Sequence, residues 1–467
     1  MPHTQTNTRS IASDVLPTID EMRALFRLAI PVTVVQVGMM VMGTVDSIMV
    51  GHYSAVALAA VALGNLYFFG LAIFGIGVLM ALDPVVAQAV GAKDEPAIAR
   101  GMQRGIVLAL VLSVPSSLLL LTAGPILGLL QQPDELVPVA AGYALRVMPG
   151  VFPFLAFVSV RQGLQAMHRL APIVVTILAA NVVNAALNYV MVFGKLGVPA
   201  MGAYGSAWAT SLSRWLMALA LLLLAWKDLK PYLTPILPES LATKPIWRML
   251  RLGLPIGVQL QLEMTAFGAI AIFMGLLGTV EVAGHQVAIN LASMTFMVPL
   301  GVSMAASVMV GNAVGRNDVV AARRYARAAL FTGGGFMAAT AGVFLGMPGA
   351  LARIYTTDPA VLALAVSLIP IAGVFQVFDG LQVVCVGILR GLGDTRAPMV
   401  VALVGFWLIG TPVSVLLGFA TPLGAQGLWW GILAGLGAVA AFLLVRVRLQ
   451  MRRNLSRVVI DEPQSVY

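Results

Sequence analysis

Four carboxylates lie inside long apolar stretches of this sequence: Asp46, Asp83, Glu263 and Asp379. An ionised side chain at the centre of a bilayer costs on the order of 3 kcal/mol even on lenient insertion scales, so such residues usually line cavities or ion paths. Burial favours the neutral carboxyl and a bound cation favours the ionised one. Asp46, Glu263 and Asp379 therefore suit the exchange of protons, Na+ or cationic solutes. Asp83, beside Pro84 near the end of a span, better suits an interfacial or capping role.

Three asparagines accompany these acids. Asn181, Asn184 and Asn188 recur at i, i+3 and i+7 within one apolar segment, so they share one helical face. Amides on that face suit three roles: coordinating a cation, hydrogen-bonding Asp46, or packing one helix against another.

Further polar side chains lie later in the chain. Gln259 precedes Glu263 by about one helical turn, and His285 and Gln286 occur in the next span. His285 suits either titration near neutral pH or plain packing. Arg214, also within a span, is expected to be the counter-charge of one of the buried acids.

Composition indicates the elements that must hold these residues. The chain has 467 residues, of which 60% are hydrophobic and 10% are charged. A soluble domain carries roughly 25% charged residues, so a soluble enzyme and a disordered chain are excluded. A spanning helix takes about 20 apolar residues, which predicts an all-α integral membrane protein with about twelve spans. Their expected starts lie near residues 27, 57, 103, 138, 172, 202, 248, 283, 325, 361, 397 and 424.

The chain contains an internal repeat. Residues 27–31 (RLAIP) match residues 251–255 (RLGLP) at a shift of 224 positions (251 − 27), and the same shift pairs Asp94 with Asp318. Each half therefore holds six spans. Because an even number of spans returns the chain to its starting side, the halves share one orientation, as in transporters built from parallel repeats.

The acids break this register. Their matching positions hold neutral residues: Ile270 for Asp46, Ser307 for Asp83 and Met39 for Glu263. We expect this asymmetry if the two halves bind different things, such as a coupling ion and a substrate.

The distribution of charge predicts the topology of the chain. The two six-helix lobes are expected at residues 25–226 and 248–447. The cytoplasmic segments are expected to be the N-terminal tail (1–24), the linker between the lobes (227–247) and the C-terminal tail (448–467). With both termini inside, only five of the 28 Lys and Arg residues fall outside or within spans: Arg146, Arg161, Lys195, Arg214 and Arg353. The basic excess is thus an orientation signal, and no nucleic-acid partner is expected.

Other chemistry finds no support in the sequence. There is no GxxxxGK[ST] phosphate-binding loop, the four histidines lack zinc-ligand spacing, and the single cysteine, Cys385, lies in an apolar run. We expect no enzymatic activity, no cofactor beyond a coupling ion, and no metal apart from Na+ at Glu263 and Asp379.

Several motifs together point to a family: Pro31, Asp46, Gly51 and Leu58–Ala60 in the first half, Gln88–Ala92 closing the second span, and Gly253–Pro255, Glu263, Gly284–Gln286, Phe375–Asp379 and Leu389–Thr395 in the second half. In these motifs the chain resembles the multidrug and toxic compound extrusion (MATE) family, over residues 25–450. The positions of the acids resemble its NorM-like branch.

The resemblance implies twelve helices in two lobes around a V-shaped cavity. It implies an antiporter of the inner (plasma) membrane that exchanges Na+ or H+ for organic, often cationic, drugs by alternating access. It also implies a protein that lies in the lipid bilayer and functions as a monomer. By the same resemblance, Glu263 and Asp379 would form the cation site of the second lobe, and Asp46, Asn184 and Asn188 the site of the first.

Three departures and one alternative qualify this interpretation. Asn188 stands where relatives of another branch carry an acid, Phe375 stands where some NorM-like relatives carry tyrosine, and Asp83 is outside the family pattern. The alternative is a flippase for a lipid-linked sugar. Its anionic cargo would need a basic cavity, whereas the spans are expected to hold four acids against Arg161 and Arg214.

Overall fold

The computed structural model describes residues 17–461, and every regular element in that range is helical. Twelve helical segments are long and apolar enough to cross a membrane, which confirms the predicted all-α, twelve-span fold. They are α1 (Ile19–Tyr53), α2 with α3 (Ala55–Leu79, Leu82–Gly91), α4 (Glu95–Leu120), α6 with α7 (Val137–Val147, Val151–Ala166), α8 (Ala171–Phe193), α9 (Ala203–Leu224), α11 (Thr243–Leu277), α12 (Thr279–Gly315), α13 (Val319–Gly346), α15 (Pro359–Gly391), α16 with α17 (Arg396–Ala402, Thr411–Phe419) and α18 (Ala425–Arg452). The short helices are α5 (Ala123–Leu129), α10 (Trp226–Leu233) and α14 (Pro348–Arg353).

Capping residues explain why some helices begin before their apolar runs. α1 begins at Ile19 because Thr18 and Glu21 form a capping box, in which the Thr18 amide donates to Glu21 Oε2 at 2.9 Å. α4 begins at Glu95 because Asp94 Oδ1 accepts from the Ala97 amide at 3.1 Å. Hydropathy detects where a helix enters an apolar layer, whereas the cap fixes where the helix begins.

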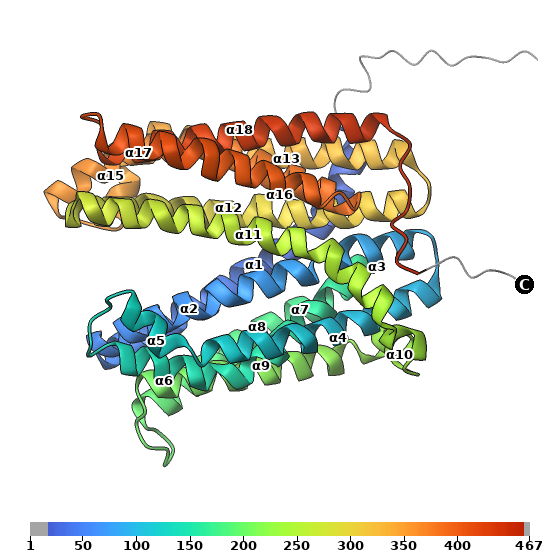
Figure 1. The fold of residues 1–467 in the computed structure, drawn as a ribbon, viewed down its shortest axis with the longest axis horizontal. Helices are drawn as coiled ribbons and strands as arrows, with labels where there is room; N and C mark the ends of the chain where they lie inside the picture. The colour runs from blue at the N-terminus through green and yellow to red at the C-terminus, as the bar shows by residue number, and fades with distance from the viewer. Residues whose placement is uncertain (1–16, 462–467) are drawn as a thin grey trace, which may run out of the picture.

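The helices form two lobes (Figure 1). The N-lobe holds α1 to α10 and the C-lobe holds α11 to α18. The first turns of each lobe are exchanged: Leu25 and Leu28 of α1 pack in the core of the C-lobe, and Met249 of α11 packs in the core of the N-lobe. Leu25 and Met249 are 224 positions apart, so this exchange follows the repeat.

Backbone geometry preserves the repeat in detail. Gly202 and Gly424, which precede α9 and α18, have nearly identical torsions: φ 52° and ψ −124° for the first, φ 51° and ψ −123° for the second. Asp318 caps α13 as Asp94 caps α4, accepting from the Ala321 amide at 2.9 Å. The two lobes are therefore copies of one scaffold with a common orientation.

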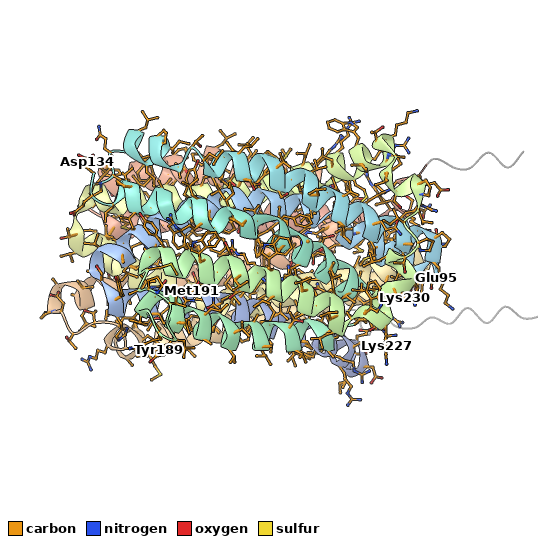
Figure 2. The ribbon with its side chains drawn as sticks, turned by 90° about the horizontal axis from the view of Figure 1, so that it is seen from below. Glu95, Asp134, Tyr189, Met191, Lys227 and Lys230 are labelled. Carbon is orange, nitrogen blue, oxygen red and sulfur yellow. The ribbon has the colours of Figure 1, made fainter. Side chains whose placement is uncertain are left out.

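The ends of the molecule differ in charge. Figure 2 shows Glu95, Lys227 and Lys230 at one end and Asp134 and Tyr189 at the other. The turns and helix ends at the first end also carry Lys93, Arg169, Arg316, Arg396 and Arg452. We call this the basic end. In Figure 1 the lobes converge toward it and their helices diverge toward the opposite end.

At the basic end the lobes touch backbone to backbone. A Cβ atom placed on Gly91, the last residue of α3, would lie 2.0 Å from the carbonyl oxygen of Asn312. A Cβ atom placed on Gly315, the last residue of α12, would lie 2.0 Å from the carbonyl oxygen of Gln88. Because Gln88 and Asn312 are themselves matched by the repeat, the same contact is made twice.

Side chains add to this junction. Gln88 Nε2 donates to the carbonyl oxygen of Gly391 at 2.9 Å. Asn312 Nδ2 lies 2.9 Å from Nε2 of His168, in the turn between α7 and α8. Burial, with the charge of Arg316, lowers the pKa of His168, so its imidazole is neutral at neutral pH and can accept this hydrogen bond.

The segment after α18, residues 453–461, returns to the N-lobe. Its polar contacts include Arg457 Nη1 to Asp94 Oδ2 at 2.9 Å, Val458 N to Gln88 Oε1 at 2.7 Å and Arg104 Nη2 to Asp461 Oδ1 at 2.7 Å. Burial alone raises the pKa of Asp461, but the hydrogen bonds and charges of Arg104 and Arg100 lower it overall. The end of the C-lobe is thus fastened to the N-lobe.

Replacing the interface glycines should open or destabilise this junction. We expect Gly91→Ala and Gly315→Ala to lower the free energy of unfolding by about 1–3 kcal/mol, because each new methyl group meets backbone that cannot rotate away. Gly342→Ala is the matched control, since a Cβ there meets nothing within 4 Å. Thermal melting in detergent measures the effect, and interface variants that melt like the control would contradict the close approach.

Candidate functional site

The N-lobe acid is held by hydrogen bonds from two other helices. Asp46 of α1 is 4% exposed. Asn188 Nδ2 of α8 donates to Asp46 Oδ1 at 2.7 Å, and Thr210 Oγ1 of α9 donates to Asp46 Oδ2 at 3.2 Å. The predicted hydrogen bond between Asp46 and the asparagine face is therefore present.

Unpaired amide groups surround this carboxylate. Asn184 is fully buried, and neither its Oδ1 nor its Nδ2 has a hydrogen-bond partner among the described residues. The same holds for Oδ1 of Asn188. Buried polar atoms normally find partners, and hard cations bind through carboxylate and amide oxygens. Asp46, Asn184 and Asn188 thus offer oxygen atoms suited to a small cation.

Asn181 has a packing role. Its Nδ2 donates to the carbonyl oxygens of Gly38, on α1, at 3.0 Å and of Ile177 at 2.9 Å. It joins α8 to α1 about two turns from Asn188, which favours the packing interpretation for this residue.

Arg214 supplies positive charge near Asp46 without touching it. The two attract each other electrostatically, but the guanidinium lies over the rings of Phe68 at 4.0 Å and Phe154 at 5.0 Å. This stacking holds the cation beside aromatic faces. The sequence predicted Arg214 to be the counter-charge of one of the acids without indicating which one. The structure places Asp46 in that role.

The C-lobe brings two acids close together, and few hydrogen-bond donors contact their carboxylates. Glu263 of α11 and Asp379 of α15 are close enough for the charge of one to act on the other. Gln382 Nε2 donates to Glu263 Oε2 at a long 3.4 Å. Asp379 is 6% exposed, and its Oδ1 has no hydrogen-bond partner among the described residues. Two neighbouring carboxylates repel each other, and a proton or cation between them relieves that repulsion.

A cluster of aromatic rings includes Phe375, one helical turn before Asp379 on α15. Phe375 of α15 lies between Phe267 and Trp429, with ring centroids 5.9 Å and 5.7 Å away. His285 packs edge-on against Trp429 at 5.6 Å. His285 Nδ1 is buried with no partner in residues 17–461. The ring of Phe375 belongs to this apolar cluster and supplies no oxygen ligand.

The remaining predicted residues differ in environment. Gln259 is buried on α11, one turn before Glu263. Gln286 is exposed on α12, where its Nε2 lies 3.4 Å from Oδ1 of Asn290. Neither side chain forms a hydrogen bond with Glu263 or Asp379 in the described part of the chain, so neither holds the acids of this site.

Asp83 belongs to neither group. Its Oδ2 lies 3.4 Å from Nη1 of Arg390, which is on α15 of the other lobe. The charge count placed Arg390 among the residues on the cytoplasmic side, and the structure places it in the last turn of α15, where it is 5% exposed. Its charge is compensated across the lobe boundary, so it needed no exposure to water.

Sequence reasoning missed two hydrogen-bonding partners of the acids. Gln382 lies three residues after Asp379, a spacing that places both on one face of a helix and could have identified it. Thr210 carried no comparable signal, because serine and threonine are common throughout its span.

A family model described as MatE matches residues 31–190 and 255–416, one segment in each lobe. The chain belongs to the MatE family. Among curated relatives, the probable multidrug resistance protein NorM of Bradyrhizobium diazoefficiens is 36% identical, with 93% of this chain and 94% of the relative covered. The multidrug resistance protein MdtK of Edwardsiella ictaluri is 34% identical, with 93% and 97% covered. The predicted family is confirmed.

Solved structures of MATE transporters have the same overall fold as this chain. The crystal structure of the eukaryotic MATE transporter AtDTX14 superimposes with a TM-score of 0.85 at 25% identity, covering 93% of this chain and 98% of that one. The outward-facing conformation of a multidrug resistance MATE family transporter gives a TM-score of 0.83 at 20% identity, covering 95% and 98%. The second likeness concerns the fold alone.

The hydrogen bond between Asn188 and Asp46 should be measurable as a coupling energy. We expect Asn188→Leu to lower the free energy of unfolding by about 1–3 kcal/mol, because a buried carboxylate loses its shortest hydrogen bond. Adding Asp46→Asn should restore part of that loss, since a neutral amide is less costly to bury.

Asn181→Leu is the matched control, because Asn181 donates to backbone oxygens. Adding Asp46→Asn to this control should restore nothing. Thermal melts of five variants (Asp46→Asn alone, the two single asparagine variants and the two double variants) and of the wild type close both cycles. Equal effects of Asp46→Asn in the two backgrounds would show that Asn188 does not hold the carboxylate.

Proposed function

We propose that this MatE-family chain is a secondary active efflux antiporter that exchanges Na+ or H+ for small organic, often cationic, compounds. The observation that carries the proposal is the pair of acids in the C-lobe, buried Asp379 and half-buried Glu263, with one oxygen of Asp379 lacking any partner among residues 17–461. Such a pair is most stable with a proton or cation between its members. The names of the multidrug resistance relatives support small organic compounds as cargo.

The driving force is sufficient for such an exchange. One elementary charge moving down 100 mV yields about 2.3 kcal/mol. That free energy sustains roughly a fifty-fold concentration ratio of the exported compound. One cation at the C-lobe acids is therefore enough to drive useful efflux of a neutral compound. A monovalent organic cation exchanged one for one moves no net charge, so its efflux draws on the concentration gradient of the coupling ion instead.

The arrangement of the lobes supports alternating access. The lobes touch through backbone at the basic end, which we place in the cytoplasm because Lys and Arg accumulate there. The opposite end, where the lobes diverge in Figure 1, would then face outward. In this proposal the chain acts as a monomer in the inner membrane with both termini in the cytoplasm.

A lipid-linked anionic cargo has less support. Two buried arginines that might attract it are already engaged: Arg214 stacks on aromatic rings, and Arg390 pairs with Asp83. Arg161 donates to Oε1 of Gln36 at 3.0 Å. Asp379 of the C-lobe, by contrast, has no ion pair among the described residues, and its Oδ1 has no hydrogen-bond partner there.

The C-lobe acids should be required for coupling. We expect Glu263→Gln and Asp379→Asn each to slow efflux by about tenfold or more, because each variant removes a negative charge to which the coupling cation binds. A tenfold slower rate corresponds to an increase of about 1.4 kcal/mol in the transport barrier. Efflux of a fluorescent organic cation from vesicles, with Na+ and pH gradients imposed separately, measures the rates and identifies the ion.

Glu281→Gln serves as the control, since Glu281 lies in the first turn of α12, away from Glu263 and Asp379 in sequence and without an ion pair in the described chain. It should transport like the wild type. Wild-type coupled efflux by both C-lobe variants would exclude these acids as the coupling site.

A further inference from the structure

One charged contact breaks the symmetry of the lobe interface. The paired glycines and the Gln88 and Asn312 carbonyls make equivalent contacts in both directions. At the same shift of 224 positions, Asp83 corresponds to Ser307. The ion pair between Asp83 and Arg390 therefore has no counterpart on the other side of the interface. A duplicated scaffold that adds one unmatched ion pair indicates a role beyond packing.

The ion pair is deeply buried and only partly satisfied. Asp83 is 0% exposed and Arg390 is 5% exposed, and their closest nitrogen and oxygen atoms are 3.4 Å apart. Oδ1 of Asp83 and Nε of Arg390 have no hydrogen-bond partners in the described chain. A buried ion pair with unsatisfied atoms contributes little stability compared with apolar residues of similar size. What it does supply is a specific charge contact between the lobes that exists only while they are closed at the basic end.

Each member of the pair has a second, opposite charge within its own lobe. Arg161, on α7, attracts Asp83 electrostatically, and both belong to the N-lobe. Glu263, on α11, attracts Arg390, and both belong to the C-lobe. If the lobes part at the basic end, neither Asp83 nor Arg390 is left without compensation.

The geometry of α15 brings Arg390 toward the acids of the C-lobe. Gln382, which donates to Glu263, lies eight residues before Arg390, or about 12 Å along the helix. Side chains on a helix lean toward its N-terminus. The long Arg390 side chain therefore extends from the lobe interface in the direction of Glu263.

We propose that Asp83 and Arg390 form an exchangeable charge lock. They pair with each other while the lobes are closed at the basic end. When the lobes part there, Asp83 pairs with Arg161 and Arg390 pairs with Glu263. Arg390 is thus a positioning residue that competes with the coupling cation for Glu263 on the side where that cation must leave. This inference rests on the proposed antiport.

The first test measures the separation of the lobes directly. Spin labels on Lys227→Cys and Val320→Cys, exposed residues of the N-lobe and C-lobe near the basic end, report it by pulsed electron paramagnetic resonance. The single native cysteine, buried Cys385, is replaced by alanine. In the full-length protein we expect Asp83→Asn and Arg390→Gln each to move at least half of the population to longer distances.

Two controls separate the lock from general disturbance. Arg390→Lys keeps the charge and should retain the wild-type distance distribution. Asp394→Asn removes an ion pair of 2.7 Å with Arg446 that lies within the C-lobe, and it should also retain that distribution. If the single neutral variants do not fold, the charge-swapped variant Asp83→Arg with Arg390→Asp keeps the pair of the closed lobes but places like charges beside Arg161 and Glu263, so it should stay at the wild-type distance, and a shift to longer distances overturns the lock. A wild-type distribution in the variants that lack the pair overturns the lock.

The second test addresses the exchange with Glu263. Because Arg390 competes for Glu263, Arg390→Gln should bind the coupling cation several-fold more tightly than the wild type, whereas Arg390→Lys should not. Direct binding of Na+, or proton uptake where Na+ does not bind, measures the affinity. Unchanged affinity in Arg390→Gln overturns the exchange. A wild type that binds neither ion contradicts the antiport, and the distances still decide whether the lock exists.

Discussion

The structure depends on a close backbone contact between two copies of one scaffold. Gly91 against Asn312 and Gly315 against Gln88 bring the lobes together at the basic end with no room for a side chain. Interfaces packed this tightly have discrete arrangements rather than continuous ones. The exchange of the first turns of α1 and α11 between the two cores joins the lobes further. A molecule fastened in this way at one end can open only by releasing a defined set of contacts.

Within this symmetric scaffold the charges are unequal, and so is their compensation. Asp46 is stabilised by Asn188 and Thr210, whereas Asp379 faces another acid and lacks a partner for one oxygen. In a medium of low dielectric constant, that difference determines which acid gains most from a bound cation. The N-lobe site is a hydrogen-bonded carboxylate among amides, and the C-lobe site is a repelling pair that needs a positive charge.

Much of this arrangement could be predicted from sequence because it is carried by local patterns. The constant shift of 224 positions predicted the parallel repeat, and the helical spacing of Asn184 and Asn188 predicted an amide face for Asp46. Contacts between distant segments could not be predicted in this way. The burial of Arg390 could not be predicted, because its partner, Asp83, lies 307 positions away and in the other lobe. Helix starts were misplaced where a polar cap such as Asp94 precedes the apolar run.

The central claim is that Glu263 and Asp379 together hold the coupling ion while Asp46 forms a separate site. Proton release from the purified protein tests it most directly, followed with a pH-sensitive dye in weak buffer as Na+ or an organic cation such as ethidium is added. We predict that the wild type and Asp46→Asn release protons, and that the double variant Glu263→Gln with Asp379→Asn does not. Undiminished release by the double variant would contradict the claim.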